Sequence, residues 1–297
     1  MGAAMRRGPG WTLRVPRSAR ASAFAPSTLA ELAWQRTRDA ASHWSFWGLA
    51  AGALAALVVF APAAWLARGI AAATGERLLL TDPRGTVWSG SALPVLTGGP
   101  GSREAAALPG RVGWTLAWRG LGFELRARQA CCINGEAVVH VRPGFGRMSA
   151  TLRPAEGGWI ARWPAGWLAA LGTPWNTLQL GGVLSLSSPG LTLESVQGRW
   201  RLNGLAELDV VDASSRLSTL PQLGSYRLTV QGSGGSSTLT LATLEGPLEL
   251  SGEGQWAPTG VRFRGEARAA QGSQAALDNL LNIIGRRQGE RSVISIG

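Results

Sequence analysis

The sequence predicts a mainly β protein in which one N-terminal transmembrane helix precedes a curved antiparallel β-sheet, of the β-sandwich or half-barrel kind, with a short C-terminal helix. Three observations predict this fold: an uncharged apolar stretch near the N-terminus, apolar residues at every second position in many short segments, and one late segment with apolar residues at helical spacing. They divide the 297 residues into a tail (1–43), a transmembrane helix (44–66), a linker (67–77) and a β-rich domain (78–297).

The tail, residues 1–43, is basic and has no apolar periodicity. Its arginines outnumber the acids Glu31 and Asp39. We predict a mostly disordered segment whose arginines lie on acidic lipid headgroups. Because an excess of arginine before a span marks the cytoplasmic side, the tail is expected in the cytoplasm and the β-rich domain in the periplasm. The arginines are Arg6, Arg7, Arg14, Arg17, Arg20, Arg36 and Arg38.

The apolar stretch is long enough to cross a bilayer. From Ala40 to Ala67 the chain contains no Asp, Glu or Arg. At 1.5 Å per residue, Trp44–Leu66 makes a helix of about 34 Å, against a hydrocarbon core of about 30 Å. Trp44, Trp47 and Trp65 lie near its ends, where indoles favour the headgroup region.

A cleaved signal peptide is the alternative to a retained anchor. Phe46–Phe60 could serve as its apolar region, and Ala61–Ala63 resembles a cleavage site. We predict a retained anchor, because the preceding segment is far longer than a usual signal-peptide basic region and Pro62 lies inside the cleavage triplet.

Apolar residues alternate with small or polar ones throughout the β-rich domain. In Val112–Trp118 every second residue is Val, Leu or Trp, as in a half-buried strand. Tight turns between such segments predict consecutive antiparallel pairing. The same spacing occurs at Phe123/Leu125, Val139/Val141, Met148/Ala150/Leu152, Leu184/Leu186, Leu191/Leu193, Leu208/Val210, Tyr226/Leu228/Val230, Leu239/Leu241, Leu248/Leu250 and Val261/Phe263. The turn signals are Asn134-Gly135, Pro143-Gly144, Pro189-Gly190, Asn203-Gly204, Gly234-Gly235 and Gly246-Pro247.

Two segments of this domain are predicted to be helical. Pro164–Leu171 begins with Pro and is followed by Gly172, which suits a short surface helix. In Ser273–Gly285 the serine can cap the N-terminus and the glycine can close the C-terminus. Its apolar face is formed by Leu277, Leu280, Leu281 and Ile284. We expect this helix to cover part of the sheet, and Ser292–Ile296 to return as a final strand.

No catalytic, metal or cofactor site can be nominated. His43 lies at the membrane boundary and His140 in an alternating strand, and neither has a metal-ligating companion at useful spacing. Common nucleophile, zinc and phosphate-binding motifs are absent, and the acids are spread singly like solvent-facing strand residues. We therefore predict no enzyme, no cofactor and a solvated His140.

The charge of the chain does not point to nucleic acid. All 29 basic residues are arginines, and the formal charge is +11. The arginines are scattered through the strands instead of forming one stripe, which argues against a nucleic-acid interface. No nucleic-acid partner is predicted.

Cys131 and Cys132 are adjacent in the sequence. Neighbouring Cα atoms lie about 3.8 Å apart, below the usual disulfide range of about 4.4–6.8 Å. We therefore favour two inert thiols at a strand end over a vicinal disulfide, and either over a redox site, which would need a C-x-x-C arrangement.

Tryptophan is abundant beyond the predicted anchor. Such side chains can fill a wide core, or they can line an open apolar trough for a lipid or a partner's segment. We favour the core. These tryptophans are Trp88, Trp114, Trp118, Trp159, Trp163, Trp167, Trp175, Trp200 and Trp256.

Several segments together resemble protein N of the bacterial type II (general) secretion system. The most specific are RGTVWSG (Arg84–Gly90), which contains Gly85, Thr86, Trp88, Ser89 and Gly90, and the terminal LLNIIGRR segment, which ends in Gly285, Arg286 and Arg287. WTLAW, LGSYRLTVQG and LATLEGPLELSGEGQW add to the likeness. The resemblance covers about Leu49 to the last residue; the long basic tail and the paired cysteines depart from the family pattern.

The resemblance implies a single-pass component of the Gram-negative inner membrane with a periplasmic β-rich domain. Such a protein is ancillary to the export of folded proteins across the outer membrane, through contacts with other secretion-system subunits. Physically, Leu78–Ala92 is predicted to begin the sheet as its first strand, with Gly85 and Gly90 bracketing a four-residue strand in which Trp88 packs inward. The second function class is a periplasmic lipid-handling protein, because amphipathic antiparallel strands after one span also suit a hydrophobic trough for a lipid ligand. The sequence gives no oligomeric state.

Overall fold

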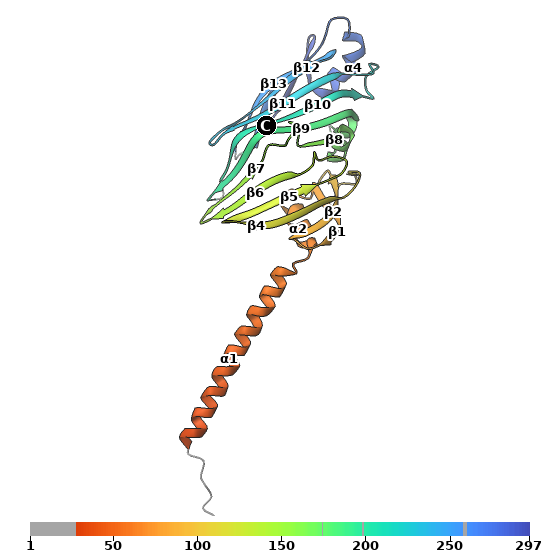
Figure 1. Ribbon diagram of the computed structural model, residues 1–297. Helices are drawn as coiled ribbons and strands as arrows, with labels where there is room; N and C mark the ends of the chain where they lie inside the picture. The colour runs from red at the N-terminus through yellow and green to blue at the C-terminus, as the bar shows by residue number, and fades with distance from the viewer. Residues whose placement is uncertain (1–27, 174, 198, 258–259) are drawn as a thin grey trace, which may run out of the picture. The chain divides into compact units, whose positions relative to one another are not determined.

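The computed structural model describes residues 28–173, 175–197, 199–257 and 260–297 (Figure 1). The predicted disorder of the tail falls largely on residues outside this description. The chain divides into two units, residues 1–55 and residues 56–297. The first contains most of helix α1 (Thr28–Val59), and the second contains the sheet and its helices.

The sheet is a single antiparallel layer with an open strand order. The order of hydrogen-bonded strands is β1-β2-β4-β5-β6-β7-β9-β10-β11-β12-β13-β14-β16-β15, with β3 also paired to β2 and β8 to β9. The predicted mainly β, antiparallel class is confirmed, but the described strands form one sheet and not a two-sheet sandwich. The strands are β1 (Leu78–Gly85), β2 (Ser89–Thr97), β3 (Ala105–Ala107), β4 (Val112–Arg119), β5 (Gly122–Arg128), β6 (Ala137–Gly144), β7 (Arg147–Leu152), β8 (Ala161–Pro164), β9 (Leu180–Val196), β10 (Arg199–Ser215), β11 (Gly224–Ser233), β12 (Ser237–Glu245), β13 (Leu248–Ala257), β14 (Gly260–Ala269), β15 (Arg286–Gln288) and β16 (Arg291–Ile296).

Two predicted turns are wrong, because β9 and β10 run through them. Pro189-Gly190 lies at a bulge inside β9, and Asn203-Gly204 lies inside β10. A Cβ on Gly204 would collide with the carbonyl of Gly190, and both glycines have positive φ. The glycines therefore permit close approach of two long strands where the sequence suggested a reversal.

The helix predicted over Trp44–Leu66 is divided. Helix α1 ends at Val59, and α2 (Ala63–Ala73) begins after Pro62, which has an extended backbone. Proline cannot donate a backbone hydrogen bond and disfavours helix at the preceding residue, which explains the break. Trp65 thus belongs to α2, and most of the predicted linker is helix. Within the described residues, none of the helices combines the length and the apolar character that a membrane crossing requires.

Two helices cover parts of the same face of the sheet, and each creates a core. Ala63 of α2 is buried against Ala92 and Trp114. Helix α4 (Gln274–Ile284) buries its leucines against a larger cluster that includes Tyr226 and Leu248. The register of the strands places both cores on one face, since directly opposed residues point to the same side.

The remaining short helices lie beside this sheet. The predicted helix at Pro164–Leu171 is a 3₁₀ helix, η1 (Ala165–Leu171), and the short α3 (Trp175–Leu178) follows it. The predicted final strand is confirmed as β16.

Candidate functional site

The motif RGTVWSG forms the turn between β1 and β2. The first strand does begin at Leu78, but the strand predicted between Gly85 and Gly90 is wrong. Gly85 pairs with Gly90 at the end of the hairpin, and the Thr86 amide donates to the Ser89 carbonyl at 2.8 Å. The Ser89 amide donates in return to Thr86 Oγ1 at 3.1 Å. Gly85 has a φ of 87°, which favours glycine.

Gly90 brings this turn into contact with the core. A Cβ at Gly90 would lie 2.6 Å from the Arg84 carbonyl oxygen and 2.7 Å from Trp114 Cζ2. Trp114 is buried, and its Nε1 donates to the Val87 carbonyl at 3.1 Å. The motif therefore needs glycine here because an indole and two backbone segments occupy the space.

The same turn holds the segment that joins α1 to α2. Trp88 Nε1 donates to the Val58 carbonyl at 2.8 Å, and the Val87 amide donates to the Ala61 carbonyl at 2.9 Å. Pro62 and Thr86 form an isolated antiparallel bridge. Trp88 is half-buried, with its ring 6.2 Å from that of Phe123. The family-like motif thus fixes the end of the apolar helix to the first hairpin.

The C-terminal motif also has a structural role. Leu277, Leu280 and Leu281 are buried and Ile284 is half-buried, as predicted. Gly285 has an extended backbone and does not close the helix in a left-handed conformation; instead, a Cβ there would lie 2.5 Å from the Val293 carbonyl. The side chain of Ser273 makes no cap hydrogen bond, which corrects that expectation.

The two arginines of the C-terminal motif lie in β15. Arg286 is exposed, whereas Arg287 is half-buried and its Nη2 lies 2.8 Å from Asp278 Oδ1. This ion pair joins β15 back to helix α4.

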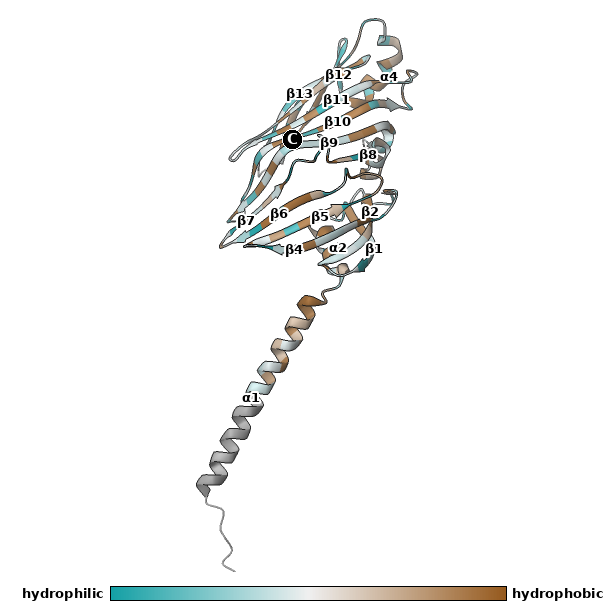
Figure 2. Cartoon of the chain, viewed as in Figure 1, coloured by the Kyte–Doolittle hydropathy of each residue, from teal (hydrophilic) through white to brown (hydrophobic). Residues whose placement is uncertain are grey.

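Between the two helix-covered cores, apolar side chains lie on one face of the sheet. The row Leu116, Leu125, Val139, Leu152 and Leu191 crosses five neighbouring strands in register. All five side chains are half-buried, and Val139, Leu152 and Leu191 belong to neither core. Figure 2 shows the alternation of hydrophobic and hydrophilic positions along these strands.

The tryptophans do not fill a wide core, which corrects our preferred reading. Trp114 is buried, but Trp118, Trp175, Trp200 and Trp256 are exposed. The reason is architectural, because a single sheet has no second layer to cover side chains beyond the reach of α2 and α4.

The opposite face of the sheet carries charges in ion pairs, and Glu124 is the most buried of them. Arg126 Nε donates to its Oε1 at 2.7 Å, and this hydrogen bond outweighs burial to lower the pKa of Glu124. His140 Nε2 lies 3.2 Å from Oε2, so the predictions of a solvated His140 and of solvent-facing acids are wrong here. A similar pair joins Arg227 to Asp209 at 2.8 Å.

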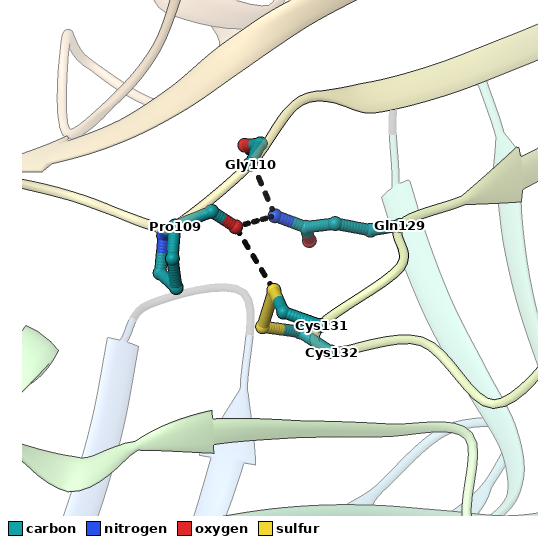
Figure 3. The surroundings of a disulfide bond; sticks show 5 residues. All are labelled: Pro109, Gly110, Gln129, Cys131 and Cys132. Carbon is teal, nitrogen blue, oxygen red and sulfur yellow. Dashed lines mark hydrogen bonds between the residues drawn. A yellow bond between two sulfur atoms is a disulfide. The ribbon is translucent and has the colours of Figure 1, made fainter.

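Cys131 and Cys132 form a vicinal disulfide, so the preference for free thiols is wrong (Figure 3). The bond lies in the loop between β5 and β6. Cys131 Sγ lies 2.9 Å from the Pro109 carbonyl oxygen, to which Gln129 Nε2 also donates at 3.2 Å. Cys132 is buried, and its carbonyl accepts from the Arg162 amide at 2.7 Å. The contacts surrounding the bond fix two loops together.

The other predicted residues are placed as follows. Trp44 and Trp47 are exposed on α1, and Trp65 is exposed on α2. In the part of the chain that the structure describes, no group of three or more His, Cys, Asp or Glu residues could hold a metal ion.

Comparison with known proteins gives one family. The family model described as "Type II secretion system (T2SS), protein N" matches residues 76–294, which include the whole sheet except Ser295 and Ile296 at the end of β16. No curated protein and no solved structure matches the chain.

Proposed function

The chain belongs to the protein N family of the type II secretion system, and we propose that it is a non-catalytic, membrane-tethered subunit that supports the secretion machinery by protein contacts. Membership makes it a component of type II secretion in the Gram-negative envelope. The family is one of machinery components and is not known for catalysis. The match over residues 76–294 is the observation that carries the proposal.

The tether in this proposal is the uncharged part of α1. Ala40–Val59 contains no charged residue, and at 1.5 Å per residue it reaches about 30 Å, the thickness of a hydrocarbon core. Large apolar side chains on the described part of this helix, such as Trp47 and Leu49, are exposed. The arginine-rich tail favours an N-terminus in the cytoplasm and a sheet in the periplasm.

Protease accessibility tests the tether and its orientation. In spheroplasts, added protease should digest the sheet-containing part and leave a short fragment that resists carbonate extraction. Release of the whole chain by carbonate would overturn the tether, and full protection of the chain would overturn the orientation.

Deletion of the gene tests the secretion role. In a host that secretes through this pathway, loss of the chain should leave folded exoproteins in the periplasm. Export at the level of the parent strain would contradict the proposal.

A second candidate function, lipid handling, is favoured by the apolar face between the two cores. A half-buried row that crosses five strands without belonging entirely to either core suits an acyl chain. In this case, the deletion strain would secrete normally but become permeable to detergents and large antibiotics.

A further inference from the structure

Exposed apolar side chains lie along the border of the sheet that is formed by one set of strand ends and their turns. Strands β4, β6, β9, β11 and β13 all end there, and β5, β7, β10, β12 and β14 begin there. We call this border the Trp–Arg rim, and the border at the other ends of the strands the opposite edge. Its exposed apolar residues include Trp118, Leu121, Phe145, Met148, Trp200 and Trp256. They belong to four different turns, so they form a line along the edge and not one patch.

Arginines accompany these apolar residues. The exposed arginines of the rim are Arg119, Arg142, Arg147, Arg199, Arg201 and Arg262. Arg119 lies 3.8 Å from Glu124, and the other five form no ion pair with any residue that the structure describes. At the opposite edge some arginines pair with acids, as in Arg128–Glu136 and Arg287–Asp278, whereas Arg103, Arg153 and Arg216 form no described ion pair. The rim therefore differs from the opposite edge in that its unpaired arginines lie beside a line of exposed aromatic and aliphatic side chains.

A cavity of about 260 Å³ opens at the middle of the rim. Trp200 and Trp256 line it together with Leu193 and Leu202. Gly234 and Gly235, in the turn between β11 and β12, also line it. Arg199 and Arg201 also contribute to the lining, although alternation along β10 points their side chains to the opposite face of the sheet from Trp200.

The segment Val58–Pro62, which follows the proposed anchor in the sequence, is held at this same end of the strands. The β1–β2 turn points in the direction in which β4 ends, since β1 and β4 each lie antiparallel to β2. This turn holds Val58, Ala61 and Pro62. Trp88 in the turn lies beside Phe123, whose ring is 4.6 Å from that of Trp118 on the rim.

We propose that the Trp–Arg rim docks on an anionic phospholipid surface, with its arginines on lipid phosphates and its apolar side chains at the headgroup level. Indoles favour this depth of a bilayer, and an anionic surface attracts unpaired arginines. A protein partner would be engaged mainly through a few clustered hot-spot residues, whereas these side chains follow a whole edge. The proposal rests on the proposed membrane tether, which keeps the rim near lipid at high effective concentration.

The test uses the full chain in nanodiscs of phosphatidylcholine alone or with phosphatidylglycerol. A fluorophore is attached at the rim through Leu121→Cys or, as a matched control, at the opposite edge through Thr219→Cys, which replaces another exposed residue. Nitroxide-labelled lipids report contact by quenching. We expect quenching at position 121 to increase when phosphatidylglycerol is present, and quenching at position 219 to stay low in both.

Charge variants make the test specific. Arg142→Gln, Arg199→Gln and Arg201→Gln should each lower the docking equilibrium about fivefold. Arg103→Gln, Arg153→Gln and Arg216→Gln change exposed arginines at the opposite edge and should leave quenching at position 121 unchanged. Far-UV circular dichroism confirms that each variant keeps the sheet.

The outcomes separate this inference from the tether. Chain that fails to insert into nanodiscs would overturn the tether, and with it the basis of docking. Inserted chain with equal quenching at both edges, or with quenching indifferent to phosphatidylglycerol and to the rim variants, would overturn docking alone. Rim cross-links to another secretion subunit without lipid quenching would assign the rim to a protein partner and would also overturn docking.

Discussion

Gly90 joins the first hairpin to the core, and its environment can be tested against a neighbouring glycine. Gly90→Ala places a methyl group within 2.9 Å of two carbonyls and the Trp114 ring, so it should destabilise the fold by about 1–3 kcal/mol. Gly113→Ala is the control, because a Cβ there meets nothing closer than 3.9 Å. Urea unfolding midpoints measure both; equal midpoints would contradict the packing described.

Glu124 should make stability depend on pH. The hydrogen bond from Arg126 lowers its folded-state pKa, so the unfolded chain takes up the proton first as pH falls. The stabilisation is therefore complete above the ordinary glutamate pKa of about 4.3 and is lost as pH falls through the lower folded value. Glu124→Gln should flatten the dependence of the unfolding midpoint on pH below about 4.3. Glu253→Gln changes an exposed residue without a described ion pair, so it should leave the pH dependence of the unfolding midpoint as it is in the parent protein.

At the residue scale, alternation predicted which side chains share a face but not which charges are buried. Glu124 and His140 meet only because β5 and β6 pair in one register, and that register depends on long-range pairing. The disulfide was misjudged from typical Cα separations, which describe pairs that are not adjacent. The rim had a visible signal in the repeated arrangement of aromatic residues and arginine beside turns, as in WRGLGF and GRWR.

Helix α4 was predictable because its apolar face has clear helical spacing, and its packing can be tested directly. Leu281→Ala should cost about 2–5 kcal/mol, since the side chain is buried in the larger core. Ile283 lies on the same helix but is exposed, so Ile283→Ala should change the unfolding midpoint of the protein little. A similar midpoint for the two variants would indicate that α4 does not cover the sheet.

The β1–β2 turn was wrongly predicted as a strand. Its conformation depends on contacts with the segment from Val58 to Pro62, and the residues of the turn alone do not reveal these contacts. Trp88→Phe removes the hydrogen bond to the Val58 carbonyl while retaining an aromatic ring. We expect faster amide hydrogen exchange at Val87 and Ala61 and a loss of about 1 kcal/mol. Trp118→Phe changes an exposed tryptophan and should leave hydrogen exchange at both amides unchanged.

At the scale of the whole molecule, the sequence predicted the antiparallel sheet, its C-terminal helix and its last strand. The prediction left a sandwich and a half-barrel both open, because alternation is local and the two architectures have the same pattern; the single open sheet decides between them. The division of the apolar stretch at Pro62 was not predicted, because Pro62 was considered only as part of a cleavage triplet. How much of the apolar face stays uncovered depends on where α2 and α4 pack, and no local pattern determines that.

The most direct test of the central claim is the distribution of one exoprotein between medium and periplasm in a gene-deletion strain. The account predicts periplasmic retention in the deletion strain and restored export with the full chain. Residues 56–297, which keep α2 and the contacts of Val58–Pro62 with the first hairpin, are delivered to the periplasm by a cleavable signal and should restore export only weakly, because they lack the tether. Export by the deletion strain equal to that of the parent would contradict a role in secretion, and full rescue by residues 56–297 would contradict the need for a tether.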